Sequence, residues 1–350
     1  MLRCARDTCC QIGEPSVPID THAHYIPPQL IAAIKARGRD IGVALVPADG
    51  GKEALRFAYG FKVRPFFPRL VEPVADRLKW LDEQRLDRQI VGTWPDIFAY
   101  GLPREHGIAW HRMLNDTLTE WTADHSNRFD WISSVPLTDA EAAAAELERS
   151  LNAGAIGVII SANVEGTNIG ELPLEPFWRK AEALGAPVLL HPVLATAVPR
   201  IGKFALGQIA HYTYDTTLGI GSLIMSGVFD RFPKLTFLMS HGGGTYPYLA
   251  GRFDVMHGRM DKVAQANVAK EPPSAYARRM TYDSIVHAPK ALRFLIEIAG
   301  IENVLLGTDY SFPPADMEPL AMVQSAGLSK ADSDAISDGN PRRVFTRMRR

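Results

Sequence analysis

Short apolar runs alternate with longer helical patterns along most of this sequence, and the alternation restricts the possible folds more than any other feature. Eight runs are candidate strands because they are rich in β-branched and apolar residues: Val17–Asp20, Gln89–Trp94, Phe129–Val135, Ile156–Ile160, Pro187–His191, Leu235–Ser240, Met280–Asp283 and Asn303–Gly307. Several are almost wholly apolar, which is typical of parallel strands covered on both faces. Eight strand–helix repeats in 350 residues predict an α/β fold, a (β/α)8 TIM barrel.

An open, doubly wound sheet is the main alternative. In the dinucleotide-binding form of that fold, a glycine-rich phosphate loop follows the first strand. No such loop follows Val17–Asp20 here, so the barrel is favoured.

The alternation is interrupted over residues 38–75, between the first expected helix and the second expected strand. This stretch is rich in glycine, proline and aromatic residues. Because structureless connections of this length are uncommon within a domain, we interpret it as an insertion that covers the top of the barrel. Residues 1–16 are predicted to be a disordered extension, and residues 17–350 to form one domain.

Composition argues against several classes of protein. The 38 basic and 39 acidic residues leave no cationic excess for a nucleic acid. No apolar run reaches the ~18 residues of a membrane span, and the N-terminus lacks the apolar segment of a signal peptide. The three cysteines (Cys4, Cys9 and Cys10) lie in the polar extension, where they could bind a metal, but a loose tail in a reducing compartment is favoured. We therefore expect a soluble, cytoplasmic protein without nucleic-acid or membrane partners.

Metal-binding residue types follow four of the expected strands. Active sites of such barrels lie at the C-terminal ends of the strands. The groups found there are His22, His24, His191, His241 and Asp309. His22 and His24 are two residues apart, so both point to the same side of a strand. A lone histidine at a strand end is more often a hydrogen-bonded packing residue, but five such groups at one rim indicate a mononuclear metal site.

Imidazoles with one carboxylate suit Zn²⁺, and Mn²⁺, Co²⁺ or Fe²⁺ are also compatible with these ligands. Such a metal lowers the pKa of a bound water to about 7 and polarises a substrate oxygen. The fourth expected strand runs into Ser161-Ala162-Asn163 and supplies no lysine, which argues against a carbamate-bridged pair of metals.

The chain resembles the amidohydrolase superfamily, and within it the metal-dependent decarboxylase branch typified by 2-amino-3-carboxymuconate-6-semialdehyde decarboxylase. The resemblance rests on four motifs at strand ends: Asp20–His24, His191-Pro192, Ser240–Gly244 and Gly307–Tyr310. It extends over nearly the whole chain from Val17. The resemblance implies that His22, His24, His191 and Asp309 bind one divalent metal, usually zinc. It leaves His241 off the metal, placed to orient or deprotonate a metal-bound water.

The same resemblance implies substrate contacts. Arg252 matches a substrate-carboxylate arginine that the neighbouring subunit contributes, which implies a homodimer. Arg64 falls near the second such arginine of the family, although Arg69 is close enough to be the alternative. Phe312 matches an aromatic residue near the substrate. Ser311 departs from the family pattern, which has proline at this position.

We therefore expect a non-oxidative decarboxylase that acts on a small unsaturated or aromatic carboxylic acid, either aminocarboxymuconate-semialdehyde-like or hydroxybenzoate-like. Water could add to the conjugated system before CO2 leaves, or the ring carbon could be protonated directly. His241 and Asp309 are the expected proton carriers in both routes. The alternatives are a hydrolase of a lactone or amide on the same metal site, and a non-catalytic metal-binding protein that kept the barrel.

Overall fold

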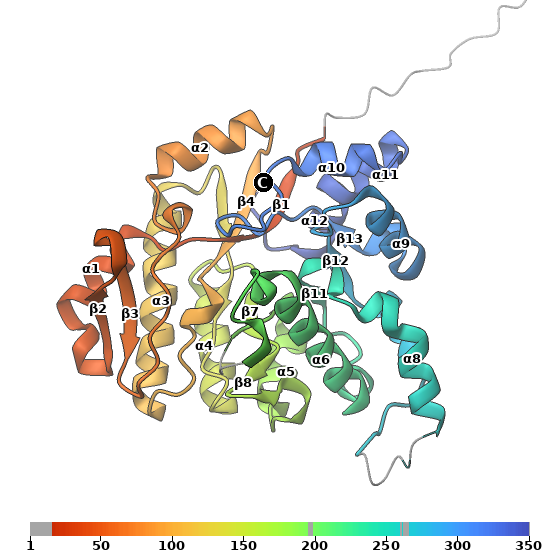
Figure 1. The fold of residues 1–350 in the computed structure, drawn as a ribbon, viewed down its shortest axis with the longest axis horizontal. Helices are drawn as coiled ribbons and strands as arrows, with labels where there is room; N and C mark the ends of the chain where they lie inside the picture. The colour runs from red at the N-terminus through yellow and green to blue at the C-terminus, as the bar shows by residue number, and fades with distance from the viewer. Residues whose placement is uncertain (1–15, 195–198, 260, 262–265, 350) are drawn as a thin grey trace, which may run out of the picture.

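The computed structural model describes residues 16–194, 199–259, 261 and 266–349. Eight parallel strand positions form its centre (Figure 1). In chain order these are β1 (Ile19–His24), β4 (Arg88–Gly92), β5 (Phe129–Trp131) continued by β6 (Ser133–Ser134), β7 (Val158–Ser161), β10 (Val188–His191), β11 (Phe237–Met239), β12 (Thr281–Asp283) and β13 (Val304–Leu305). The predicted (β/α)8 fold is confirmed.

Two seams join the strands into a closed barrel. At the first, β5 pairs with β4 while its continuation β6 pairs with β7. At the second, the chain around β13 meets β1 through backbone hydrogen bonds. The amide of Thr21 donates to Leu306 O (2.9 Å), that of Asp309 to His22 O (2.8 Å) and that of His24 to Tyr310 O (2.7 Å). Backbone groups of three expected metal ligands, and of residues next to them, therefore close the barrel.

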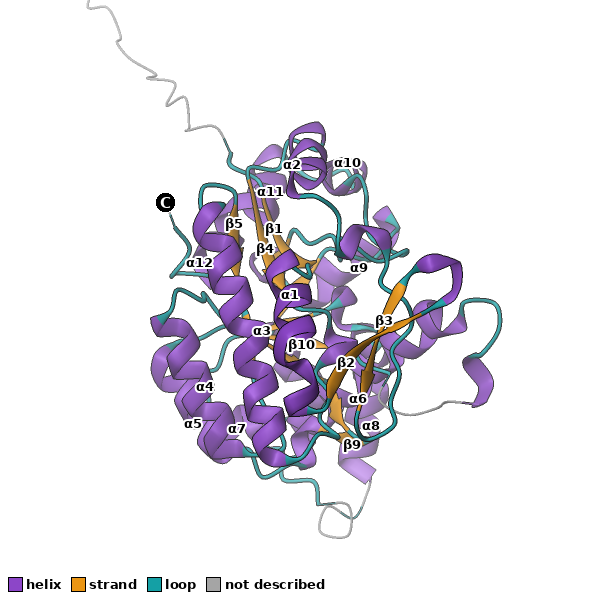
Figure 2. Cartoon of the chain, turned by 90° about the vertical axis from the view of Figure 1, so that its left-hand side faces the viewer, coloured by secondary structure: helices purple, strands orange, loops and turns teal. Residues whose placement is uncertain are grey.

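Helices surround the strands (Figure 2). The α-helices that follow the chain around the barrel are α1 (Pro28–Arg37), α2 (Val74–Glu83), α3 (Arg104–Asp124), α4 (Ala140–Asn152), α5 (Glu175–Leu184), α6 (Tyr212–Met225), α7 (Val228–Arg231), α8 (Tyr246–Arg259), α9 (Pro289–Ala299), α10 (Pro319–Ser325), α11 (Lys330–Asp334) and α12 (Asn340–Val344). α4 shows how the sequence specifies such a helix. Asp139 caps its first turn by accepting a hydrogen bond from the amide of Ala142, and Ala143, Leu147 and Leu151 bury one face.

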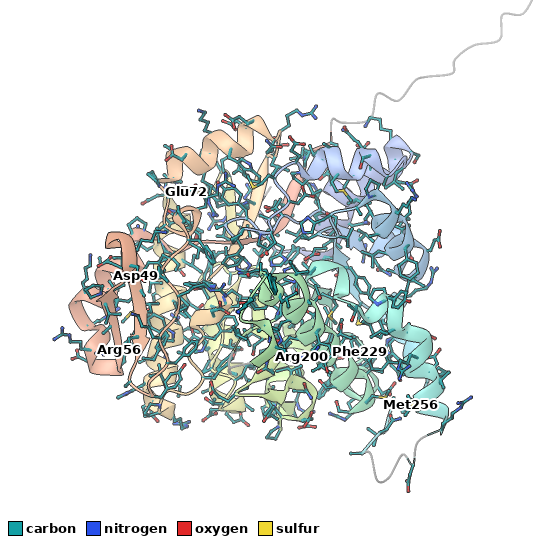
Figure 3. All side chains as sticks on the ribbon, viewed as in Figure 1. Asp49, Arg56, Glu72, Arg200, Phe229 and Met256 are labelled. Carbon is teal, nitrogen blue, oxygen red and sulfur yellow. The ribbon has the colours of Figure 1, made fainter. Side chains whose placement is uncertain are left out.

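The segment 38–75 contains an antiparallel hairpin of β2 (Val43–Pro47) and β3 (Glu53–Phe57). Figure 1 shows this hairpin beside α1 and α3 at one edge of the barrel, and Figure 3 labels Asp49 and Arg56 there. A second apolar cluster, separate from the main core, holds the hairpin against these helices. After the hairpin the chain returns toward the barrel mouth, where Phe67 packs on Trp94 and Phe312.

Two further expectations concern the N-terminal extension and membrane-spanning helices. The extension 1–16, with its three cysteines, lies outside the described residues except for Ser16. Among the helices that the structure describes, none has the length and apolar character needed to cross a bilayer.

Candidate active site

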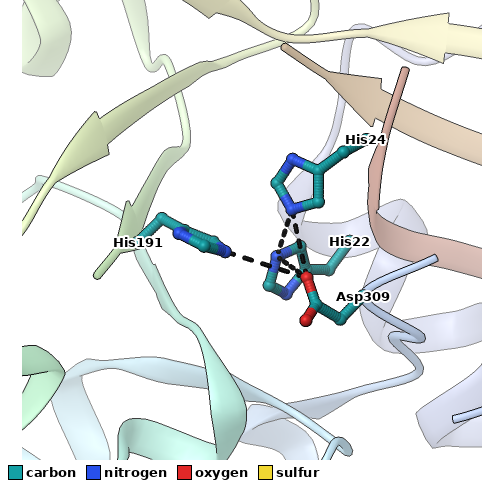
Figure 4. Close-up of side chains that lie close together, drawn as sticks. All are labelled: His22, His24, His191 and Asp309. Atoms are coloured by element: carbon teal, nitrogen blue, oxygen red, sulfur yellow. Dashed lines mark hydrogen bonds and ion pairs between the residues drawn. The ribbon is translucent and has the colours of Figure 1, made fainter. Parts of the chain in front are cut away.

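Four candidate metal ligands converge at the mouth of the barrel. His22 and His24 are on β1, His191 ends β10, and Asp309 follows β13; all four are buried. One ligand atom from each lies within 4.8 Å of the others. The Nε2 atoms of His24, His22 and His191 are 3.2, 3.5 and 3.8 Å from Asp309 Oδ1 (Figure 4). The structure thus brings together all the metal ligands that the family resemblance implied.

The hydrogen bonds behind the cluster fit a bound cation. Nδ1 of His22 lies 2.7 Å from Asp283 Oδ2, that of His24 lies 3.0 Å from Thr93 O, and that of His191 lies 2.7 Å from Pro192 O. If each Nδ1 donates to its acceptor, each Nε2 keeps its lone pair for a metal. His191 Nε2 and Asp309 Oδ1 are buried and have no hydrogen-bond partner among the described residues. A divalent ion would satisfy both atoms, so these residues fit one metal.

Burial and charge hold three of the four groups, His24, His191 and Asp309, in states that suit ligation. Burial lowers the pKa of His24 and takes that of His191 well below its ordinary value. Burial acts in the same direction on His22, but its hydrogen bond to Asp283 and the nearby carboxylates leave its pKa raised. Burial alone would raise the pKa of Asp309, yet the neighbouring His191, His24 and His241 keep it well below the usual value. Asp309 is therefore an ionised carboxylate.

His241 faces the cluster from the end of β11. Its Nε2 is 3.4 Å from Asp309 Oδ2, and its ring centroid is 5.3 Å from that of His191. It is not one of the four converging ligand atoms. Its backbone has a φ of 54°, and Asp309 has a φ of 57°; such left-handed conformations are uncommon outside glycine and occur preferentially at functional sites. The glycines that follow His241 allow the chain to turn here, since a Cβ on Gly244 would lie 2.1 Å from Thr213 O.

Two buried carboxylates behind the cluster were not predicted. Asp283 accepts hydrogen bonds from the amides of His241 and Gly242, each at 2.8 Å, in addition to its contact with His22. Asp20 accepts from Thr308 Oγ1 (2.6 Å), and burial raises the pKa of Asp20 to about 6. Both residues end predicted strands, and this position was the one feature of the sequence that could have indicated their place beside the cluster.

A cavity of about 280 Å³ opens beside the cluster, with His191, His241 and Asp309 in its wall. This volume is near the lower end of the ~300–1,000 Å³ range of ligand pockets, so it suits a small molecule. Phe312 lines the cavity, and its ring centroid is 4.8 Å from that of His24. His287, which the sequence analysis did not single out, also lines it and has a φ of 54°.

Arg64 is in the cavity wall, whereas Arg69 is not. Arg64 Nη2 donates to Asp96 Oδ2 (2.7 Å) and to the hydroxyl of Tyr212. The Arg64 guanidinium lies over the Phe67 ring, 5.2 Å from its centroid. Arg69 instead lies over Tyr310, outside the cavity. Asp96 and Tyr212 were missed, because only the tertiary fold brings Tyr212 to a residue 148 positions earlier.

Arg252 lies apart from the other predicted site residues. It is an exposed residue of α8, which begins at Tyr246, and it does not line the cavity. Tyr248, Val255 and Met256 share its helix face and are also exposed.

Comparison with known proteins establishes the family. A family model described as amidohydrolase matches residues 19–347. The chain belongs to the amidohydrolase family. This amidohydrolase is 33% identical, over 269 residues, to 2-amino-3-carboxymuconate-6-semialdehyde decarboxylase from Dictyostelium discoideum, covering 75% of this chain and 74% of that one. It is 27% identical, over 323 residues, to gamma-resorcylate decarboxylase from Rhizobium sp. (strain MTP-10005), covering 84% and 94%.

A solved structure extends the likeness to the fold. The dihydroxybenzoic acid decarboxylase from Polaromonas sp. JS666, solved with bound manganese and the inhibitor 2-nitroresorcinol, superposes with a TM-score of 0.76 at 22% identity. The alignment covers 96% of this amidohydrolase and 98% of that chain. At this level of identity the comparison establishes a shared barrel.

Proposed function

We propose that this amidohydrolase is a metal-dependent, non-oxidative decarboxylase of a small unsaturated or aromatic carboxylic acid. One observation carries the proposal: three imidazole Nε2 atoms and Asp309 Oδ1 converge beside His241, and His191, His241 and Asp309 are part of the wall of a small, aromatic-lined cavity. The decarboxylase names of the two curated relatives support the same reaction.

We assign the metal site to one divalent ion held by His22, His24, His191 and Asp309. Three nitrogens and one carboxylate oxygen suit Zn²⁺, and the manganese in the Polaromonas neighbour makes Mn²⁺ the second choice. When bound, such an ion acts as a Lewis acid on substrate or water oxygen.

Decarboxylation needs an electron sink and a proton. The bond between the substrate carbon and its carboxylate breaks, CO2 leaves, and the electron pair stays on the conjugated carbon, which then takes up one proton. His241 is the proton carrier that we favour, because its Nε2 faces the cluster and an imidazole nitrogen can both accept and donate a proton. Asp309 is better suited to ligation than to proton transfer, since its low pKa keeps it ionised.

The substrate would lie between the metal site and Arg64. Phe312 and Phe67 would contact an unsaturated or aromatic ring, because their own centroids are 5.6 Å apart along the same cavity. Arg64 would bind a substrate oxygen with the nitrogens that Asp96 and Tyr212 leave free.

We further propose a homodimer in which Arg252 reaches the partner's cavity. Two features support this arrangement. Arg252 is outside its own cavity, and Tyr248, Val255 and Met256 beside it are 81%, 46% and 48% exposed. Met256 is labelled on α8 in Figure 3. An apolar helix face of this kind suits contact with a second copy of the chain.

The proposal is tested by metal analysis and a substrate panel. Purified protein should hold one divalent metal per chain, and removal by a chelator should abolish turnover that Zn²⁺ or Mn²⁺ restores. Hydroxybenzoates or muconates should be decarboxylated with release of CO2. Lactones should not be opened, and amides should not be cleaved. Two metals per chain, full metal content in His22→Ala, or hydrolysis without CO2 would contradict the proposal.

A further inference from the structure

The polar end of the cavity contains a carboxylate as well as a guanidinium. Asp96 follows β4 in a short 3-10 turn (Pro95–Ile97), and only 8% of its side chain is exposed. Arg64 and Asp96 are both in the cavity wall, and their side chains form an ion pair at 2.7 Å. The positive charge that a substrate would meet at Arg64 is therefore already balanced by a negative charge.

Tyr212 completes this group from α6. Its hydroxyl accepts from Arg64 Nη2 and donates to Asp96 Oδ2 at 3.3 Å. Both contacts of Arg64 use the same nitrogen, so its Nη1 and Nε have no hydrogen-bond partner among the described residues. The free edge of the guanidinium can donate hydrogen bonds, but it does so from a pair whose net charge is zero.

A second carboxylate on the substrate would be placed unfavourably here. It would gain hydrogen bonds from Arg64 but would lie beside Asp96, and like charges at close range in a partly desolvated site are costly. A hydroxyl group carries no charge, and it can accept from Arg64 and also donate to Asp96 or Tyr212. The three side chains therefore match a neutral hydroxyl better than an anion.

We propose that Asp96 is a specificity-determining residue that makes this end of the cavity select substrates with a hydroxyl group, rather than a second carboxylate, away from the reacting carboxylate. The inference rests on the proposed function, because it concerns the same cavity. It goes further because it predicts that monocarboxylic hydroxy acids bind more tightly than dicarboxylic acids.

Binding of matched ligands tests the inference without requiring turnover. The ligands are 3-hydroxybenzoate with isophthalate, and 4-hydroxybenzoate with terephthalate, which differ only in the second substituent. Titration calorimetry on the metal-loaded protein should give tighter binding of the hydroxy acid in each pair. Asp96→Asn should tighten dicarboxylate binding by about 10-fold to 100-fold, the range expected of a hydrogen bond to a charged group. Asp96→Glu keeps the charge and should keep the original order.

Asp116→Asn is the matched control. Asp116 forms an ion pair with Arg149 at the same 2.7 Å distance but does not line the cavity, so its replacement should leave both affinities unchanged. If Asp96→Asn does not fold, Arg64→Gln gives the reciprocal test. That variant leaves Asp96 unbalanced, so it should weaken dicarboxylate binding further and improve binding of the cationic ligand 3-(aminomethyl)benzoate.

A wild-type preference for the dicarboxylates, an unchanged ratio in Asp96→Asn, or no binding of either ligand would overturn the inference. Its failure is distinguishable from failure of the proposed function. If Asp96→Asn alters the ratio of the two affinities but no substrate releases CO2, the inference about Asp96 stands and the proposed decarboxylase activity is wrong. If CO2 is released but Asp96→Asn leaves that ratio unaltered, the decarboxylase activity stands and the inference about Asp96 is wrong.

Discussion

Nδ1 of His22 lies 2.7 Å from Oδ2 of Asp283, and both side chains are fully buried. The same carboxylate accepts the amide of His241. Asp283 therefore fixes a candidate metal ligand and the favoured proton carrier at once. We predict that Asp283→Asn lowers metal affinity by about 10-fold to 100-fold, as is usual when the hydrogen-bond partner of a ligating histidine is changed. Competition with a chromophoric chelator measures this, and unchanged affinity would reduce Asp283 to a packing residue.

His241 is predicted to move protons without binding the metal. His241→Asn should retain most of the metal and reduce turnover by at least ~100-fold, the lower limit typical of a general acid–base group. Metal content and turnover must be measured on the same preparation. Loss of metal would make His241 a ligand, and near-normal turnover would remove it from the mechanism.

Arg252 is predicted to complete the partner's cavity. Arg252→Ala and His241→Ala should each be inactive alone. When the two variants exchange subunits, one cavity of each mixed dimer has His241 from the first chain and Arg252 from the second, so activity should return. Subunit exchange is followed by mass spectrometry of differently tagged chains. A mixture that exchanges and stays inactive would contradict the shared site.

His111 is predicted to make the fold sensitive to acid. It is buried on α3, and burial lowers its pKa from 6.5 to about 3. Below pH 6.5 the unfolded chain binds a proton there that the folded chain does not, so stability falls as the pH falls from 6.5 toward 3. His111→Gln removes the group that binds this proton. The free energy of unfolding of this variant, relative to that of the wild type, should therefore increase by about 1.4 kcal/mol for each pH unit below 6.5. Urea unfolding at pH 7.5, 6.0 and 5.0 measures the difference; parallel curves would refute the prediction.

The sequence specified the fold and the ligand cluster because both depend on local patterns. A strand places alternate residues on one face, and parallel strands in a barrel end at one rim, so His22, His24, His191, His241 and Asp309 could be expected at one rim from the sequence. The division into four ligands and a separate His241 came from the family resemblance. The first strand was placed too early, at Val17–Asp20, because polar residues rarely continue a buried strand. β1 extends to His24 since each of its polar side chains has a buried partner.

The remaining site residues depend on contacts between distant segments. Ser311, which departs from the family pattern, donates to His24 O at 2.8 Å and accepts from the buried Arg77 at 2.7 Å. Arg77 itself donates to His24 O at 2.7 Å. No spacing in the sequence indicates that Arg77, 53 positions after His24, would support it. Asp96 and Tyr212 escaped prediction for the same reason.

The seam between β1 and the chain around β13 links synthesis of the protein to assembly of its site. β1 is synthesised before Asp309 and before the residues around β13 whose backbone groups bond to it. A chain interrupted after β12 has an open sheet edge and only three of the four ligands. An open sheet edge presents unpaired backbone groups that can pair with another chain. The four-ligand site therefore exists only once the chain extends through Asp309, and shorter products should tend to associate through their open edge before the site is formed.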